Sequence, residues 1–102
     1  MKKNRMRPVP PGEILSEEFL RPLGLTANAL AKAIGVPPNR ITAILKGQRG
    51  ITGDSAIRLA TFFKTSPEFW MNLQMTYDLR NADKTLPARV KKNIEENRSL
   101  LL

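Results

Sequence analysis

Cysteine and histidine are both absent from this chain of 102 residues. The chain therefore cannot form a disulfide, a thiolate or imidazole metal site, or a His- or Cys-based catalytic triad. We expect no cofactor and no enzymatic activity. Glu13 and Glu17 stand four residues apart, a spacing that suits paired catalytic carboxylates on one helix face. Together with Glu18, they are more typical of a solvated acidic face near a helix N-terminus.

Long apolar runs are also absent. No stretch approaches the roughly 18 apolar residues that a membrane-spanning helix needs. The basic N-terminus is not followed by the apolar segment of a secretory signal. We therefore expect a bacterial cytoplasmic protein that makes no membrane contact.

Acidic residues are few. The chain has 9 Asp and Glu against 17 Lys and Arg, which gives a net charge of +8 and a pI near 10.5. Such a charge attracts polyanions, although a soluble protein that is merely basic is the plain alternative. One window contains six basic side chains and a single acid, Asp54; the basic residues are Lys32, Arg40, Lys46, Arg49, Arg58 and Lys64. This distribution favours nucleic acid as the partner.

The chain divides into three parts. Residues 1–9 are basic, lack an apolar period and end among prolines, so we expect a flexible arm there, which either adds DNA contacts or has no specific use. Residues 10–81 are expected to form one all-α domain. Residues 82–102 form a charged tail, for which a short appended helix and disorder are the two alternatives.

Five helices are expected in the domain, each from an apolar period and a start signal. The first begins at Pro11 and breaks at "RPLGL", and the second is capped by Thr26 and ends at Gly35. The third ends at Gly47. The fourth follows Thr52 and is expected to bury Ala56, Ile57, Leu59, Ala60 and Phe63. The fifth starts at "SPEFW" and runs to about Arg80.

The stretch "ALAKAIGVPPNRITAIL" joins the second and third helices. Gly35 takes the left-handed backbone at a helix end, and Pro37 and Pro38 suit a first turn, whose N–H groups have no partner within the helix. Two helices joined by such a turn form a helix-turn-helix, whose second helix can lie in the DNA major groove. The corner is expected to bury Leu30, Ile34, Val36, Ile41 and Ile44, with the small Ala31 between the helices.

If Ile41, Ile44 and Leu45 face inward, the outward residues of the third helix suit base edges. Amide, guanidinium, ammonium, hydroxyl and methyl groups all have base partners in the major groove. The candidate base contacts are Asn39, Arg40, Thr42, Ala43 and Lys46. Side chains around this unit are the candidate phosphate contacts: Thr26, Asn28, Gln48 and Arg49. The alternative is an ordinary solvated face.

The fifth helix has two apolar stripes. Phe69, Trp70, Leu73 and Tyr77 lie on one side, while Met71, Met75 and Leu79 lie roughly opposite. The second stripe predicts a subunit interface, unless the tail helix folds back over it. A homodimer would read two half-sites of a palindromic operator about 34 Å apart.

Two segments carry a family resemblance: "MRPVPPGEILSEEFLRPLGLTANALAKAIGVPPNRITAILKGQRGIT" and "DSAIRLATFFKTSPEFWMNLQMTYDLR". From Met6 to Arg80 the chain resembles the HigA-like (VapI-like) antitoxins of the Xre/λ-repressor-like helix-turn-helix group. The resemblance implies a five-helix dimer whose recognition helix spans Pro38 to Lys46, which adds Pro38 to the base-facing residues. It also implies repression of its own toxin–antitoxin operon and binding of a HigB-like toxin that cleaves mRNA. A stand-alone Xre-type regulator without a toxin and a toxin-binding protein with little DNA affinity are the alternatives.

Overall fold

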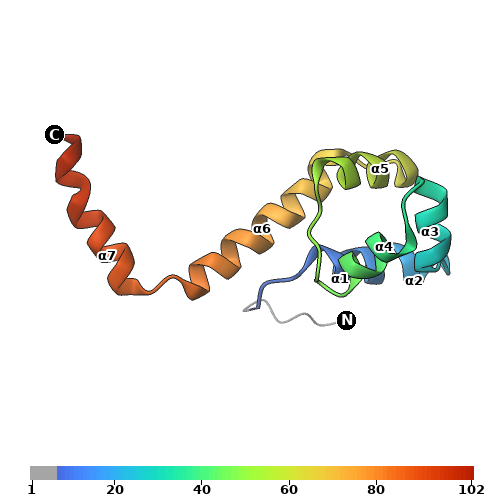
Figure 1. Cartoon of the computed structure of the whole chain (residues 1–102), viewed down its shortest axis with the longest axis horizontal. Coiled ribbons are helices and arrows are strands. Elements are labelled where there is room, and N and C mark those ends of the chain that lie inside the picture. The colour runs from blue at the N-terminus through green and yellow to red at the C-terminus, as the bar shows by residue number, and fades with distance from the viewer. Residues whose placement is uncertain (1–6) are drawn as a thin grey trace.

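The computed structural model describes residues 7–102, and within that range every regular element is helical. The expectation for residues 1–6 of the basic arm lies outside the described part. Figure 1 shows a cluster of helices at one end of the molecule and a helical extension at the other. The elements are α1 (Pro11–Ile14), η1 (Leu15–Leu20), α2 (Arg21–Leu23), α3 (Ala27–Ile34), α4 (Pro38–Leu45), α5 (Gly53–Phe63), α6 (Pro67–Thr85), α7 (Ala88–Glu96) and η2 (Asn97–Leu101).

The first three elements form one continuous rod. Pro11 occupies the first helical position, where its missing N–H costs nothing. The middle of the rod, η1, is a π-helix, and the Arg21 N–H bonds to the Ser16 carbonyl. This wider turn directly precedes Pro22, which has no N–H to continue an α-helical ladder. Gly24, at φ 61°, ends the rod, as "RPLGL" predicted.

Three helix starts that the sequence predicted are confirmed by hydrogen bonds. The hydroxyl oxygens of Thr26, Thr52 and Ser66 each accept the backbone N–H three residues later, at 3.1, 3.3 and 3.0 Å. These bonds satisfy N–H groups that the first helical turn leaves without a partner. The starts of α3, α5 and α6 are therefore fixed by local chemistry.

One core joins the rod to α3, α4, α5 and the start of α6. Its buried members are Leu15, Leu20, Leu30, Ala31, Ile34, Val36, Ile41, Ile44, Ile51, Ala56, Leu59, Ala60 and Trp70. All five apolar residues predicted for the helix-turn-helix corner are among them. The expectation for Ile57 is wrong, because this side chain is 58% exposed. The buried face of α5 runs through Ala56, Leu59 and Ala60, and Ile57 lies beyond its edge.

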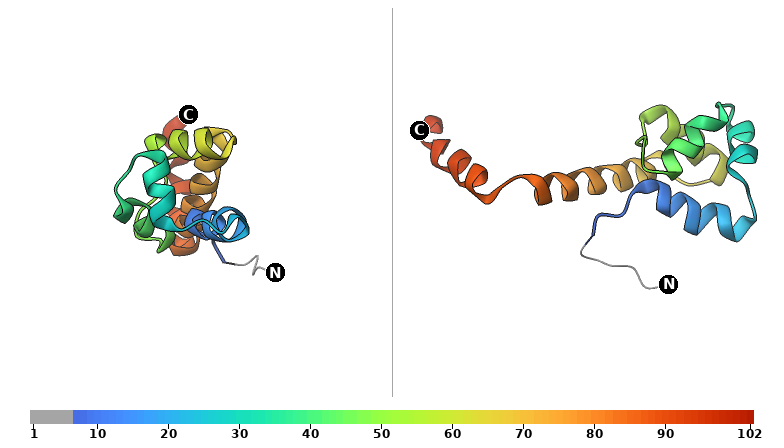
Figure 2. Two further views of the ribbon diagram at one scale, coloured as in Figure 1. Left: turned by 90° about the vertical axis from the view of Figure 1, so that its right-hand side faces the viewer. Right: turned by 60° about the horizontal axis from the view of Figure 1, so that its bottom comes forward.

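Helix α6 leaves the core and continues as an extension. Its first turn holds the buried Trp70, but the helix runs past the expected end at Arg80 to Thr85. Leu86 and Pro87 then separate it from α7, because proline cannot continue the α-helical ladder. Figure 1 and the right-hand view of Figure 2 place α7 beyond α6, away from the helix cluster. The tail thus contains a helix, one of the two alternatives.

Residues 7–102 leave the second apolar stripe of α6 exposed. Its members, which we call the methionine stripe, are Met71, Met75 and Leu79, and they are 39, 53 and 63% exposed. The alternative that the tail helix folds back over them is wrong, because α7 extends away from the core (Figure 1). Within residues 7–102, no helix is both long enough and apolar enough to cross a membrane.

Candidate nucleic-acid interface

The turn between α3 and α4 has the geometry that the sequence predicted. Gly35, at φ 73°, ends α3, and the Val36 N–H bonds back to the Ala31 carbonyl at 2.9 Å. Pro37 then takes an extended conformation as the N-cap, and Pro38 is the first residue of α4. The two prolines therefore start the second helix directly after glycine has stopped the first. This is a helix-turn-helix.

Helix α4 packs closely against the rod formed by α1, η1 and α2. A Cβ atom added at Gly12 would lie 2.0 Å from the carbonyl oxygen of Ile44, and 2.9 Å from the Cα of Leu45. The backbones of α1 and α4 therefore approach each other as only a glycine permits. Ile41 and Ile44, each 1% exposed, fill the inner side. The outer face of α4 is thereby held at a fixed angle to the scaffold.

The outer face of α4 carries most of the predicted base contacts. Pro38, Asn39 and Lys46 are exposed, while Thr42 and Ala43 are half-exposed. The Thr42 hydroxyl donates to carbonyls of its own helix, with the Asn39 oxygen at 3.2 Å, so its lone pairs are the part left for an outside donor. These five residues thus share one accessible surface.

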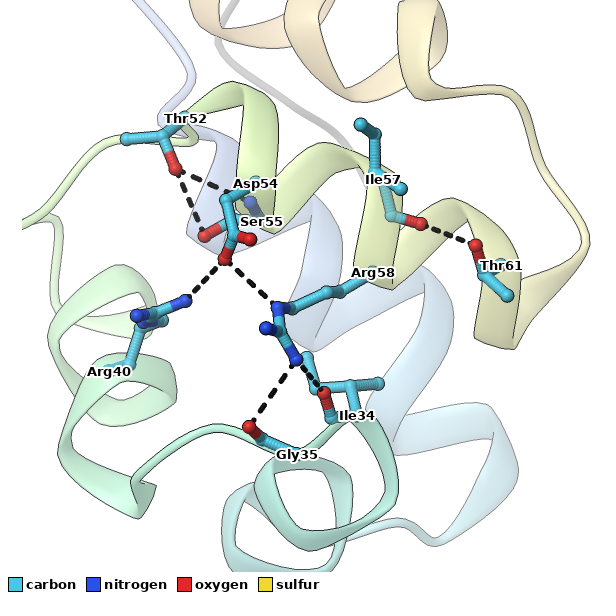
Figure 3. A network of polar contacts seen from close by, with 9 residues as sticks. All are labelled: Ile34, Gly35, Arg40, Thr52, Asp54, Ser55, Ile57, Arg58 and Thr61. Atoms are coloured by element: carbon cyan, nitrogen blue, oxygen red, sulfur yellow. Dashed lines mark hydrogen bonds and ion pairs between the residues drawn. The ribbon is translucent and has the colours of Figure 1, made fainter.

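Arg40 is placed differently from its neighbours. Its side chain is 24% exposed, and its Nη1 donates to Asp54 Oδ2 at 2.7 Å (Figure 3). The guanidinium therefore lies at the edge of α4 that faces α5. A base contact by Arg40 would have to be made from this edge.

The four candidate phosphate contacts are all exposed. Thr26 and Asn28 lie at the start of α3, where the Thr26 oxygen is also the cap. Gln48 and Arg49 follow α4 in a loop whose backbone N–H groups both donate to the Ala43 carbonyl, at 2.9 and 3.2 Å. Because those amides are occupied, Gln48 and Arg49 have only their side chains to offer an anion.

A network that the sequence analysis missed joins α3, α4 and α5. Asp54 Oδ2 accepts from Arg40 and also from Nε of Arg58 at 2.9 Å. Arg58 Nη1 in turn donates to the Ile34 and Gly35 carbonyls at the end of α3, at 2.7 and 3.3 Å (Figure 3). The spacing of Asp54 and Arg58, four residues apart on one helix, was the available signal. The link to Arg40 spans 14 residues and has no local signature.

The network is ionised at neutral pH. The hydrogen bond from Arg58 lowers the pKa of the Asp54 carboxyl, and the bond from Arg40 lowers that pKa further. A carboxyl whose folded-state pKa is depressed stabilises the fold above its unfolded pKa. That contribution is lost as the pH falls through the depressed value. The three charges therefore hold together throughout the neutral range.

The loop after α4 is also tied to α6. The backbone N–H of Ile51 donates to Oε1 of Gln74 at 2.6 Å, and Gln74 Nε2 donates to Asp78 at 2.9 Å. Ile51 itself is buried. The segment that carries Gln48 and Arg49 is therefore held at its far end by the helix that carries the methionine stripe.

Comparisons with known proteins agree with this geometry. Residues 17–70 match the helix-turn-helix family model HTH_3. Virulence-associated protein I of Dichelobacter nodosus is 52% identical over 81 residues, which cover 79% of this chain and 75% of that protein. Antitoxin HigA-1 of Vibrio cholerae is 44% identical over 79 residues, covering 78% and 74%.

A solved structure of Pseudomonas aeruginosa antitoxin HigA with the higBA promoter is also similar. It is 46% identical, with a TM-score of 0.76, over 88% of this chain and 94% of that one. The family is one of DNA-binding antitoxins and regulators rather than enzymes. The match to the family model covers the turn, α4 and the start of α6, which are the parts described above. The chain therefore belongs to the helix-turn-helix family, in the group of the HigA- and VapI-like proteins.

Proposed function

We propose that this protein is a sequence-specific DNA-binding antitoxin that represses its own toxin–antitoxin operon. The observation that carries the proposal is the exposed face of α4, which the turn at Gly35 and the close seat at Gly12 hold clear of the core. A relative of the same family has been solved with its promoter. A protein that binds its own operator works where the chromosome is, in the cytoplasm on the nucleoid.

In this proposal α4 lies in the major groove, with its base-facing residues against the edges of successive base pairs. The amide of Asn39 suits an adenine, the ammonium of Lys46 suits a guanine, and the Ala43 methyl suits a thymine methyl. Pro38 and Thr42 complete this surface, and Arg40 reaches it from the side. Thr26, Asn28, Gln48 and Arg49 bind phosphates and fix the register of α4.

Two alanine substitutions test these roles. Asn39→Ala is expected to weaken operator binding by about 1–3 kcal/mol and to relax the preference at one base position, because it removes a base contact. Arg49→Ala is expected to weaken binding to all duplexes alike and to lower the salt slope by about one. Lys92→Ala on α7 is the control. Fluorescence anisotropy with the operator and a scrambled duplex at several salt concentrations measures both effects; equal loss on both duplexes for both variants would contradict the assignment.

We infer that the protein acts as a homodimer, in which the two copies associate through the methionine stripe. Three apolar side chains that residues 7–102 leave exposed on one helix face favour association with a second copy. A dimer also supplies two recognition helices for a palindromic operator.

Met75→Glu tests the dimer. A charge in the middle of the methionine stripe should convert the dimer to a monomer, since burying an unpaired carboxylate is costly. Operator affinity should then fall by at least about a hundredfold, because two linked half-site contacts become one. Sedimentation velocity and anisotropy measure the two effects. Ile94→Glu, on an isoleucine of α7 that is 57% exposed, is the control; a Met75→Glu protein that remains dimeric rules the stripe out.

We also propose that the protein neutralises a HigB-like toxin that cleaves mRNA. The support is the likeness to V. cholerae antitoxin HigA-1 and P. aeruginosa antitoxin HigA. Co-expression with the product of the adjacent gene should restore growth, and the two proteins should purify as one complex. Operator binding without either result would make the chain a stand-alone regulator.

A further inference from the structure

The carboxylate of Asp54 lies beside the proposed DNA-binding face, where an acid would ordinarily repel phosphate. A single oxygen, Oδ2, accepts from two guanidinium groups on two helices, at 2.7 Å from Arg40 and 2.9 Å from Arg58 (Figure 3). The Asp54 side chain remains 56% exposed. An exposed acid that is bonded to an arginine of the proposed recognition helix is expected to affect how that helix binds DNA.

Asp54 itself is held firmly in place. It lies in the first turn of α5, two residues after the cap Thr52. Arg58, one turn further along α5, grips Asp54 with Nε while its Nη1 binds the carbonyls that end α3. The carboxylate is thus fixed by both helices that flank α4, and its oxygen is presented to Arg40 from a rigid support.

Arg40 is held at one point only. Its Nη1 bonds to Asp54, and within residues 7–102 the guanidinium makes no second polar contact. A guanidinium has five N–H donors, so most of them remain for another partner. The group lies at the edge of the α4 face, next to the residues proposed to contact bases.

We propose that Asp54 is a specificity-determining residue of the DNA site and that it acts by orienting the Arg40 guanidinium toward one base edge. The inference rests on the proposed function. A free arginine binds phosphate at many positions along a duplex, which adds affinity without sequence information. An arginine held by a carboxylate keeps a fixed direction and loses less conformational freedom when it meets a base. Two guanidinium groups and one carboxylate also leave one net positive charge at this edge instead of two.

The test compares four proteins on two duplexes. The wild-type chain selects its preferred duplex from a randomised library, and a scrambled duplex of equal length and composition serves as the reference. Asp54→Asn, Arg40→Gln and the double variant are then measured on both duplexes, and on single base-pair changes of the selected one. Glu68→Gln on α6 is the control, since it changes the net charge by the same amount. Thermal unfolding of each variant is recorded in parallel.

Asp54→Asn is expected to reduce the ratio of selected to scrambled affinity by about tenfold, as loss of one directed base contact would. The loss should be confined to one base pair in each half-site, and binding to the scrambled duplex should be unchanged or tighter. In the Arg40→Gln background Asp54→Asn should no longer change the ratio. Glu68→Gln should leave the ratio unchanged.

Other outcomes overturn the inference in distinguishable ways. If Asp54→Asn weakens both duplexes equally, or lowers the ratio just as much in the Arg40→Gln background, Asp54 acts through the fold and not through Arg40. If Asp54→Asn and Glu68→Gln behave alike, only net charge matters. If the wild-type chain selects no preferred duplex, the proposed function itself fails.

Discussion

Trp70→Ala is expected to lower the free energy of unfolding by about 3–5 kcal/mol. Trp70 is completely buried, and its ring lies 4.9 Å from that of Phe19, 5.0 Å from Phe69 and 6.2 Å from Phe63. Its Nε1 donates to the Thr65 hydroxyl at 2.8 Å. Removing the indole leaves a cavity among three rings and takes away a hydrogen bond. A domain has only about 5–15 kcal/mol of stability in total, so this loss removes a large share of it.

Urea denaturation followed by far-UV circular dichroism measures this loss, since the variant has no tryptophan fluorescence. Trp70→Phe serves as the matched variant. It keeps an aromatic ring in the cluster and removes only the larger ring and its N–H, so its loss should be clearly smaller than that of alanine. Equal stability of the alanine variant and the wild type would show that α6 does not need this anchor to join the core.

Gly12→Ala is expected to cost at least about 3 kcal/mol of stability, at the upper end of what overpacking does. The added Cβ would lie 2.0 Å from the Ile44 carbonyl oxygen and 2.8 Å from its carbonyl carbon. These atoms belong to backbone, which cannot rotate aside as a side chain can. Helix α1 must therefore move away from α4, and the core between them opens.

The same substitution should also reduce operator binding in the fraction of protein that remains folded, because α4 loses its close packing against α1. Gly53→Ala is the matched control: its added Cβ would meet no other part of the described chain within 4 Å beyond its own helix backbone and chain neighbours, and it has no positive φ. We expect that change to stay within about 0.5 kcal/mol of the wild type. Chemical denaturation of both variants makes the comparison, and similar losses at the two glycines would contradict the argument.

Much of the fold was predictable because its signals are local. Thr26, Thr52 and Ser66 each precede a helix by one residue, and the bonds they make reach only three residues along the chain. Gly35 and the following prolines likewise fix the turn without help from distant residues. The corner's buried side chains follow from the helical period once those boundaries are known.

What the sequence did not reveal depends on contacts between distant segments. In the sequence, Gly12 resembles any glycine in a first helical turn. Only the close contact with the backbone of α4 excludes a larger residue there. The periodicity of α5 placed Ile57 in the core, but the neighbouring helices cover a narrower face than the apolar residues occupy. The sequence shows Asp54 as a single acidic residue among lysines and arginines. Its bond to Arg40 could not be predicted, because it depends on how α5 packs against α4.

The candidate site shows the same division. The outward residues of α4 were deduced from which of its residues must be buried. Asn39 and Lys46 are exposed, whereas Arg40, Thr42 and Ala43 are half-exposed, and the Arg40 guanidinium is bonded to Asp54. Their contacts with DNA remain predictions. The end of α6 was placed too early, since helical propensity alone gives no stop signal between Arg80 and Pro87.

The bond between Gln74 and the Ile51 amide has a mechanical consequence for the proposed dimer. The loop that bears Gln48 and Arg49 is attached to the middle of a helix of 19 residues, which is about 28 Å long. That helix also carries the methionine stripe, the proposed contact with a second copy. In the proposed dimer, the DNA-binding loop of each protomer is therefore connected directly to its dimer helix. The distance between the two half-sites is then set by the angle at which the two α6 helices cross, and inserting one base pair between the half-sites would force that angle to change.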